Sequence, residues 1–372
     1  MQFLLNFTCR FELYECNECV DSLSTLIQSL KAGRHLSREE AELSAHLLGS
    51  EAISEADKIA FLKALADKGE TAEEVSGFAS VFRSLAIDPE VSDFAERGID
   101  VCGTGGDGFG TFNISTTVSF LLAASGIPVL KHGNRSITSK CGSADLMEAL
   151  GVQLEVPLPV HRQALEALNF TFFFAPAFHP VFKAIMPARK ALAAQGQKTI
   201  FNLLGPMINP ARPNYQLMGV FAREWLDPIA KALHALDLKS GIIVHGEPIP
   251  GSRLDELSCA GANYLQGFGA LSGEGQIVDL ADVGVSPCDP SDLKGGSVSD
   301  NLALLNDFAE QKNALMTKGL KESIYLNAGA AFYAAEQVDS IKSGVQYARE
   351  TVQSGRLLEW LLKVRAFYKD RQ

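Results

Sequence analysis

The chain has 372 residues, and its 33 Lys+Arg against 44 Asp+Glu give a formal net charge of −11, which disfavours a general nucleic-acid binder. With 47% hydrophobic and 21% charged residues, the composition is that of a soluble globular enzyme long enough for two domains. The longest nearly apolar stretch, 118–130, is interrupted by Ser125, Gly126 and Pro128. It falls short of the ~20 residues that a membrane helix needs, so we expect no membrane span.

The N-terminus and the cysteines predict a cytoplasmic location. Met1 to Leu5 carry no basic flank and no signal-peptide core follows. The seven cysteines are an odd number scattered through the chain, which favours a reducing compartment over a disulfide framework. Cys16 and Cys19 form one Cys-x-x-Cys, but a zinc site would also need Cys9 and a distant histidine, so free thiols are the favoured interpretation.

The segment from Val20 to about Leu85 shows a helical pattern. Apolar residues recur at spacings of three and four, and Ser37 stands three residues before Glu40, the arrangement of a capping box. The same logic recurs at Ser54 and Thr71. We expect an N-terminal domain of four or five short helices over 1–95, with a helical contribution from about 180–205.

From 96 to 372 the pattern changes to that of an α/β domain with a mostly parallel or mixed central sheet flanked by helices. A short apolar run, 99–102, is followed by a glycine cluster, a helical run over 115–125 and a second apolar run over 127–130, which is a βαβ unit. Further predicted strands are 216–220, 241–244 and 262–265. Predicted helices close the chain at 297–311, 320–335 and 338–369.

Two loops of the βαβ unit have the composition of anion sites. Gly103-Thr-Gly-Gly-Asp-Gly-Phe-Gly110 lies between a strand and a helix, where free backbone N–H groups and the helix dipole accept phosphate oxygens. Asn113-Ile-Ser-Thr116 follows directly, and Lys131-His-Gly-Asn-Arg-Ser136 ends the next strand. Neighbouring parallel strands share one crevice at their carboxyl ends. The two loops therefore predict one substrate with phosphate groups at both ends.

A pair of adjacent carboxylates, Asp255 and Glu256, follows the predicted strand 241–244. Mg²⁺ prefers one or two carboxylates plus water and phosphate oxygens, so the pair is a candidate metal site; alone it is also compatible with an exposed helix start. His132 beside a glycine is compatible with either a general base or a backbone-bonded loop residue, and we assign it no catalytic role.

These segments resemble the anthranilate phosphoribosyltransferase family of tryptophan biosynthesis. The resemblance rests on Asp100-Val-Cys-Gly-Thr-Gly-Gly-Asp107, Asn113-Ile-Ser-Thr116, Lys131 to Ser136, Gly142-Ser-Ala-Asp145, 199–210 and Leu254-Asp-Glu-Leu-Ser258, which occur in family order. Pyrimidine nucleoside phosphorylases of the same fold share single motifs more loosely. The resemblance implies a homodimeric transferase that moves a 5-phosphoribosyl group from phosphoribosyl pyrophosphate to the amine of anthranilate, with Mg²⁺ as cofactor and no covalent protein nucleophile.

The resemblance also implies the site residues. The donor phosphoribosyl pyrophosphate is assigned Gly103, Gly106, Asp107, Thr111, Asn113, Ile114, Ser115, Thr116, Lys131, His132, Gly133, Asn134, Arg135, Ser136, Ser139 and Ser143. Anthranilate is assigned Gly103, Asn134 and Arg189, whose guanidinium suits a carboxylate. The metal is assigned Ser115, Asp255 and Glu256.

Three features depart from the family pattern and keep other functions open. The segment between Arg189 and Thr199 is about three residues longer than expected, Cys141 stands where serine is usual, and Phe178 replaces a common polar residue. One alternative is a related transferase or phosphorylase-like enzyme with another acceptor. A second is a catalytically silent homologue that binds nucleic acid, and the negative net charge opposes it. A purely structural helical partner protein would leave the two anion loops unexplained.

Overall fold

The structure, a computed structural model, describes residues 17–136, 140–369 and 371, with only the backbone for residues 17–21. It divides into two compact units. The first joins the N-terminal segment up to Ala86 with His179–Leu204, and the second comprises Ile87–Phe178 and Gly205–Gln372. No described helix is both long and apolar enough to cross a membrane.

The first unit is helical. Its elements are α2 (Asn17–Lys31), α3 (Arg38–Gly49), α4 (Glu55–Lys68), α5 (Ala72–Ser84), the 3-10 helix η1 (Pro180–Ala184), α11 (Met186–Ala194) and α12 (Phe201–Leu204). No strand occurs among the described residues before Ile99. Four α-helices precede Ala86 among the described residues, within the predicted four or five.

Local capping fixes where these helices begin. Ser37 accepts a hydrogen bond from the Glu40 N–H while the Glu40 carboxylate accepts one from the Ser37 N–H, and Thr71 and Glu74 repeat the arrangement. Such a cap contributes about 1 kcal/mol. Glu74 is buried and also accepts from Lys68 and the Leu36 N–H, so one carboxylate joins the connection between α4 and α5 to the segment before α3. The predicted capping boxes at Ser37 and Thr71 are confirmed, whereas Ser54 caps α4 only by accepting from the Asp57 N–H.

The second unit contains a seven-stranded mixed sheet in the order β3-β2-β1-β4-β5-β6-β7. The strands are β1 (Ile99–Gly103), β2 (Val129–Gly133), β3 (Phe170–Phe174), β4 (Tyr215–Gly219), β5 (Ser240–Glu247), β6 (Ala262–Gly269) and β7 (Gly275–Ile277). The first five run parallel and β6 and β7 are antiparallel. The α/β fold with an N-terminal helical domain is confirmed.

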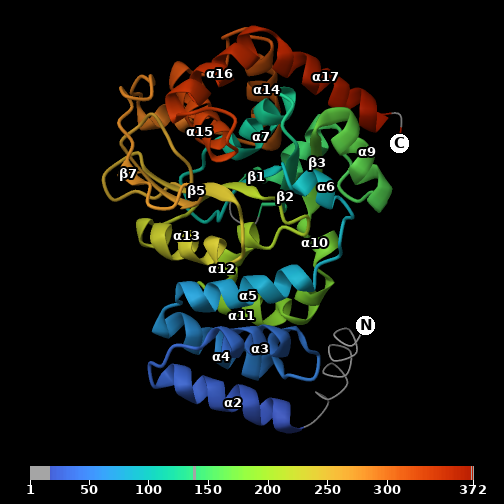
Figure 1. Cartoon of the computed structure of the whole chain (residues 1–372), viewed down its shortest axis with the longest axis vertical. Coiled ribbons are helices and arrows are strands. Elements are labelled where there is room, and N and C mark those ends of the chain that lie inside the picture. Colours follow the sequence, from blue (N-terminus) through green and yellow to red (C-terminus); the bar gives the residue numbers. More distant parts are fainter. Residues whose placement is uncertain (1–16, 137–139, 370, 372) are drawn as a thin grey trace. The chain divides into compact units, whose positions relative to one another are not determined.

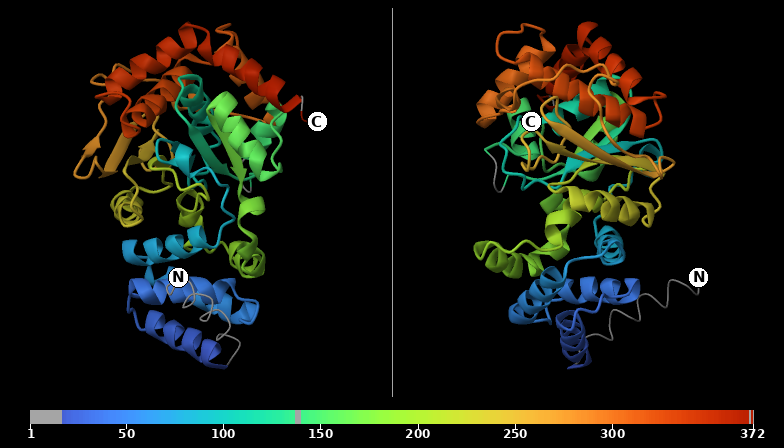
Figure 2. Two further views of the ribbon diagram at one scale, coloured as in Figure 1. Left: turned by 45° about the vertical axis from the view of Figure 1, so that its right-hand side comes forward. Right: turned by 90° about the vertical axis from the view of Figure 1, so that its left-hand side faces the viewer.

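Helices cover both faces of the sheet. Figure 1 shows α15 (Lys318–Ala334), α16 (Ile341–Gln353) and α17 (Arg356–Lys369) on one side and α13 (Leu226–His234) on the other, and Figure 2 shows the same separation from two further directions. The remaining helical elements of this unit are α6 (Ser92–Ala95), α7 (Ile114–Ala124), α8 (Ser143–Leu150), α9 (Leu158–Leu168), α10 (Ala175–Phe178), η2 (Gly205–Met207), η3 (Arg223–Trp225), η4 (Pro290–Leu293) and α14 (Val298–Ala309).

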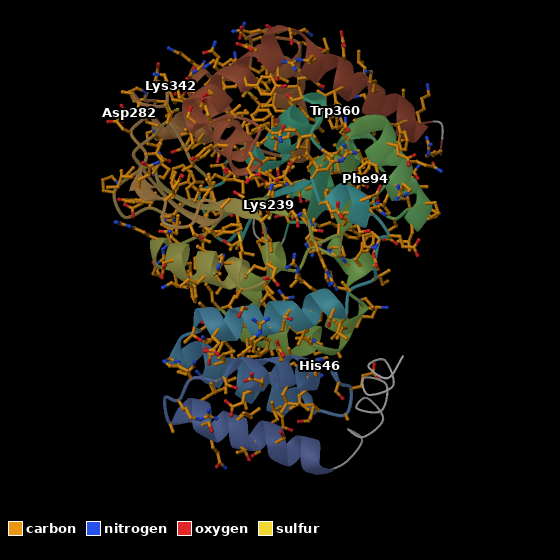
Figure 3. The ribbon with its side chains drawn as sticks, viewed as in Figure 1. His46, Phe94, Lys239, Asp282, Lys342 and Trp360 are labelled. Atoms are coloured by element: carbon orange, nitrogen blue, oxygen red, sulfur yellow. The ribbon has the colours of Figure 1, made fainter. Side chains whose placement is uncertain are left out.

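Helix α7 lies in the middle of the core. Nearly all of its residues are buried, because it packs between β1 and the helices α15, α16 and α17. Trp360, labelled in Figure 3, packs on Phe120 and Phe170, and its indole N–H donates to the Leu168 carbonyl at 2.7 Å. A helix that is apolar all round must be enclosed on every side, and this enclosure fixes the position of its N-terminus.

Several element boundaries differ from the sequence expectation. β2 begins at Val129 rather than Ile127 and runs on to Gly133, and β3 was not predicted, although it is an uninterrupted apolar run. The single helical pattern expected over 338–369 is two helices, α16 and α17, separated by Gly355 with φ +81°. Register with neighbouring strands, which local pattern does not encode, sets these strand ends.

Candidate active site

The strand order reverses between β1 and β4. From β1 the chain continues through β2 to β3 on one side, whereas β4 and β5 extend the sheet on the other. In an open parallel sheet a crevice forms at such a switch point, outside the carboxyl ends of the two strands. The two strand ends are Gly103 and Gly219, which are register partners.

The glycine loop after β1 lies directly against Asp255. The Thr104 N–H donates to the Gly219 carbonyl at 3.0 Å, and the Gly105 N–H donates to Asp255 Oδ2 at 2.7 Å. A Cβ at Gly103 would lie 2.2 Å from Asp255 Oδ2, and one at Gly219 would lie 1.5 Å from the Asp255 carbonyl oxygen. Only glycine leaves room for this acidic segment at both strand ends.

Glu256 reaches the first turn of α7. The Ser115 N–H donates to Glu256 Oε1 at 3.0 Å, while Oε2 is buried and has no hydrogen-bond partner among the described residues. Burial, and next the charge of Asp107, raise the pKa of Asp255 to about 7. Burial and the charge of Asp255 raise the pKa of Glu256 well above its usual value. The site thus holds acidic groups whose negative charge the protein alone does not neutralise.

This donor set fits a hard divalent cation. Within the described part of the chain, no three His, Cys, Asp or Glu side chains form a complete ligand set. Mg²⁺ needs no such set, since it takes one or two carboxylates and completes its shell with water and phosphate oxygens. The unpartnered Glu256 oxygen beside Asp255, with Ser115 next to it, matches that requirement. The alternative of an exposed helix start is wrong, because the pair is partly buried in a loop.

Two asparagines that the sequence analysis missed hold this site together. Asn327 of α15 brackets Leu257, accepting from its N–H at 3.0 Å and donating to its carbonyl at 2.6 Å. Asn301 of α14 accepts from the Asn113 N–H at 3.1 Å. Both lie on helices distant in sequence from the site. A single polar residue in a helical pattern does not indicate which distant segment it will contact.

The polar groups at the first turn of α7 differ in whether the fold already bonds them. Thr116 is fully buried, and its hydroxyl has no partner among the described residues. The Asn113 amide donates to the Cys141 carbonyl at 3.1 Å. Ile114 offers nothing to a ligand, because its side chain is in the core and its N–H donates to the Phe112 carbonyl at 2.7 Å.

The loop after β2 packs against the start of α8. A Cβ at Gly133 would lie 2.4 Å from Ser143 Oγ, and the Asp145 carboxylate accepts from the N–H groups of Ser136 at 3.2 Å and Gly142 at 2.8 Å. The Arg135 guanidinium pairs with Glu148 and lies over the Phe174 ring at 5.6 Å. The loop is therefore tied to α8 at several points.

The basic residues at the end of β2 and in the loop after it already bond to other groups of the protein. Arg135 forms the surface ion pair just described, half exposed. The Lys131 side chain is 1% exposed and donates to the Val101 carbonyl. His132 is buried, with Nδ1 3.2 Å from the Gly205 carbonyl, so it is a backbone-bonded residue. In this structure the lysine amine is committed to the fold.

Arg189, on α11 of the helical unit, is a partly buried cation. Its guanidinium lies over the rings of Phe201 at 4.9 Å and Phe182 at 5.9 Å, and Nη1 is 3.9 Å from Met186 Sδ. Burial lowers the pKa of Arg189, although a guanidinium stays charged in proteins. No salt bridge to it occurs within the described residues. Its donors suit a carboxylate ligand.

The structure brings most of the predicted site residues together at one edge of the sheet. Those in the α/β unit that lie in the two loops, at the start of α7 or α8, or on the acidic segment are Gly103, Gly106, Asp107, Thr111, Asn113, Ser115, Thr116, Gly133, Asn134, Arg135, Ser136, Ser143, Asp255 and Glu256. Ser139, Cys9 and Cys16 lie outside the described residues, and the side chain of Cys19 is not described. Arg189 belongs to the other unit.

Comparison with known proteins gives the family. Residues 95–358 match the Glycosyl transferase family, a/b domain, and residues 24–86 match the helical bundle domain of the same family. Anthranilate phosphoribosyltransferase of Exiguobacterium sibiricum is 39% identical over 345 residues, covering 91% of this chain and 96% of the relative. The chain belongs to the anthranilate phosphoribosyltransferase family. The enzyme of Natronomonas pharaonis is likewise 39% identical, over 92% of this chain and 98% of its own length.

Solved structures of this family share the fold. The crystal structure of the enzyme from Thermus thermophilus has a TM-score of 0.82 at 36% identity and covers 92% of this chain and 99% of its own. The Saccharomyces cerevisiae enzyme, solved in complex with PRPP and Mg, has a TM-score of 0.80 at 23% identity, covering 94% and 98%. The family resemblance drawn from the motifs is confirmed.

Proposed function

We propose that this protein transfers the 5-phosphoribosyl group of phosphoribosyl pyrophosphate to the amine of anthranilate and releases pyrophosphate. One observation carries the proposal: at the switch point of the sheet, Asp255 lies against Gly103 and Gly219, and the adjacent Glu256 lies at the first turn of α7. The glycine loop after β1 contacts Asp255, and the second loop follows the neighbouring strand β2 and packs on α8. A diphosphate with its metal suits the acids, and a second phosphate suits the other loop.

We keep as proposals the donor-binding residues assigned from the motifs, apart from Ile114, whose N–H donates to the Phe112 carbonyl, and Lys131 and His132, which are buried and bonded to backbone carbonyls. The Gly105 N–H already donates to Asp255, but Gly106 and Gly108, with φ of +74° and +73°, let the loop backbone after β1 approach a phosphate closely. The N-terminus of α7 adds its dipole and the hydroxyls of Ser115 and Thr116. These groups would bind and orient the donor.

The metal would be held by Asp255, Glu256 and the Ser115 hydroxyl. Bound there, Mg²⁺ supplies neutralisation of the charge that develops on the departing pyrophosphate. The chain's own contribution is the position of the two carboxylates, which Asn327 and the Gly105 N–H hold in place. Without a cation the buried negative charges repel one another, which adds to burial in raising both pKa values.

The acceptor needs positioning more than activation. We assign the anthranilate carboxylate to Arg189, with Gly103 and Asn134 as further contacts. The aromatic amine is neutral at pH 7, so no protein base is required for it to attack the ribose as pyrophosphate leaves with oxocarbenium-like character. Orientation and charge stabilisation then supply most of the acceleration, and no side chain acts as a covalent nucleophile.

We further propose a cytoplasmic homodimer with no nucleic-acid or membrane partner. The free thiols among the described cysteines, Cys102, Cys141, Cys259 and Cys288, suit a reducing compartment. The net charge of −11 opposes general binding to nucleic acid. Size-exclusion chromatography with light scattering tests the dimer, and a monomer at working concentration would contradict it.

The acceptor is tested by substrate competition. The purified protein with phosphoribosyl pyrophosphate and Mg²⁺ is offered anthranilate, another aminobenzoate or a nucleobase, and released pyrophosphate is measured. Release of pyrophosphate with anthranilate, and with none of the other acceptors, supports the proposal. Release only with a nucleobase would favour a related transferase, and donor-independent binding of nucleic acid without turnover would favour a silent homologue.

A further inference from the structure

The backbone pairing between β1 and β2 ends before the loops that follow these strands. β1 pairs with β4 from Ile99–Tyr215 to Gly103–Gly219, and β2 pairs with β3 from Val129–Phe170 to Gly133–Phe174. Between β1 and β2, by contrast, the register pairs Ile99 with Val129 and is not continued to Val101 and Lys131. The gap lies between the two strand ends from which the proposed phosphate loops emerge.

Two charged side chains occupy the positions of the missing ladder bonds. The Val101 carbonyl accepts from Lys131 Nζ, and the His132 N–H faces Asp100 Oδ1 at 3.4 Å. In a continued parallel ladder these buried backbone groups would bond to the neighbouring strand, and left unpaired they would be costly. Asp100 is 0% and Lys131 1% exposed, so the side-chain bonds that replace the ladder bonds are buried.

The two charges depend on each other. Burial raises the pKa of Asp100 to about 6, and the positive charge of Lys131 opposes the rise. Burial lowers the pKa of Lys131, and Asp100 is the strongest opposing group, ahead of Cys102 and Glu256. Within the described residues the two side chains form no direct ion pair, so this coupling acts through space, and removing either charge leaves the other buried with less compensation.

A third residue anchors the pair to the chain after α12. The Asn209 amide donates to Asp100 Oδ2 at 2.8 Å and to the Leu130 carbonyl at 2.7 Å, and its own Oδ1 accepts from the Ala211 N–H at 3.0 Å. The carboxylate therefore has one fixed orientation. None of these groups is exposed enough to touch a ligand, and the donor-site assignment of Lys131 leaves Asp100 and Asn209 without a role.

We propose that Asp100 and Lys131 form a charged wedge between β1 and β2 that sets the spacing of the two phosphate loops, with Asp100 as a positioning residue for the donor. The proposal rests on the proposed function for the identity of that donor. A ligand that spans both loops depends on their spacing. A ligand that occupies one loop does not.

This difference gives the test. In Asp100→Asn the carboxamide keeps the size of the side chain and removes its charge. We expect the Kd for phosphoribosyl pyrophosphate, measured by calorimetry with Mg²⁺, to rise at least tenfold, while the Kd for inorganic pyrophosphate changes less than threefold. A general loss of structure would weaken both ligands alike, so the ratio of the two Kd values separates positioning from destabilisation.

The matched control is Asp307→Asn on α14. Asp307 is also buried, at 3% exposure, and accepts from the Ala314 and Met316 N–H groups at 2.9 and 3.0 Å, far along the chain from either loop. Its substitution is expected to lower Tm and leave the Kd ratio unchanged. If both variants change the ratio equally, the wedge proposal is overturned.

A double-substitution cycle tests whether the two residues act as a unit. Lys131→Met alone should reproduce the selective loss, and it carries the test if Asp100→Asn does not fold. The Kd of the double variant for phosphoribosyl pyrophosphate should then exceed that of either single variant by less than threefold. If the two effects multiply instead, the residues act independently and not as a unit.

The outcomes for the wedge and for the reaction are distinct. A wild-type protein that binds phosphoribosyl pyrophosphate but transfers nothing to anthranilate refutes the proposed function and leaves the wedge testable by the same Kd ratio. Wild-type binding that Asp100→Asn leaves unchanged refutes the wedge alone. A wild-type protein that binds no phosphoribosyl pyrophosphate refutes both.

Discussion

Gly219→Ala perturbs the candidate metal site without touching any ligand side chain. An added Cβ would lie 1.5 Å from the Asp255 carbonyl oxygen and 2.4 Å from its carbonyl carbon. Both are backbone atoms, so no side-chain rotation relieves the clash. Since real Cβ contacts are essentially never closer than 3.0 Å, the Asp255 backbone must retreat by about 1.5 Å, and the metal carboxylate moves with it.

The magnitudes follow from that displacement. Overpacking of this kind costs about 1–3 kcal/mol of stability, a fall in Tm of several degrees for a unit of this size. A misplacement of ~1 Å at a catalytic group costs on the order of 100-fold in rate. We therefore expect kcat/KM to fall about 100-fold, with a higher Mg²⁺ concentration needed for half-maximal activity.

The assay pairs calorimetric Tm with steady-state turnover across a Mg²⁺ titration. Gly205→Ala is the matched control, because its added Cβ meets nothing within 4 Å and its φ lies outside the left-handed region; it should change Tm little and leave turnover intact. Wild-type turnover in Gly219→Ala would refute the reasoning that the strand ends position the acids.

Three further predictions address the charges. Asp255→Asn with Glu256→Gln should lose turnover yet keep or raise Tm in EDTA, because it removes negative charge that burial disfavours; a lower Tm in EDTA would contradict this. Arg189→Met should raise the KM for anthranilate about 10- to 100-fold through loss of a charge-assisted bond and leave the KM for the donor unchanged, and an equal rise in both would argue against the assignment. Burial lowers the pKa of His161 to about 4, so the unfolded chain binds the proton more readily. Stability should therefore fall as pH drops from 6.5 to 4, by about 3 kcal/mol. In urea titrations at several pH values, His161→Leu should remove that part of the pH dependence, and an unchanged pH dependence would refute the assignment.

Local signals explain what the sequence could predict. The capping pairs at Ser37 and Thr71, the helix over α7 and the glycine loop after β1 depend on residues a few positions apart, and the structure contains them. β3 escaped prediction because a short apolar run, Phe170–Phe174, does not distinguish a buried strand from part of a helix. The fold class followed from the alternation of the elements.

The geometry of the site could be predicted less well, because it depends on contacts between distant segments. The motifs assigned Asp255 and Glu256 to a metal site with Ser115, but did not indicate that Gly219 leaves room for Asp255. Lys131 was expected to face an anion, whereas its amine replaces a backbone bond between strands. Asn301 and Asn327 gave no signal at all, since only the packing of α14 and α15 brings them to the site.

The central claim is transfer from phosphoribosyl pyrophosphate to anthranilate at the acidic pair, and the most direct measurement is the loss of anthranilate fluorescence. The purified protein is mixed with both substrates and Mg²⁺, with EDTA as the control. The account predicts a magnesium-dependent loss that EDTA abolishes. Constant fluorescence in a protein that still binds phosphoribosyl pyrophosphate would contradict the acceptor, and fluorescence loss that persists in EDTA would contradict the metal site.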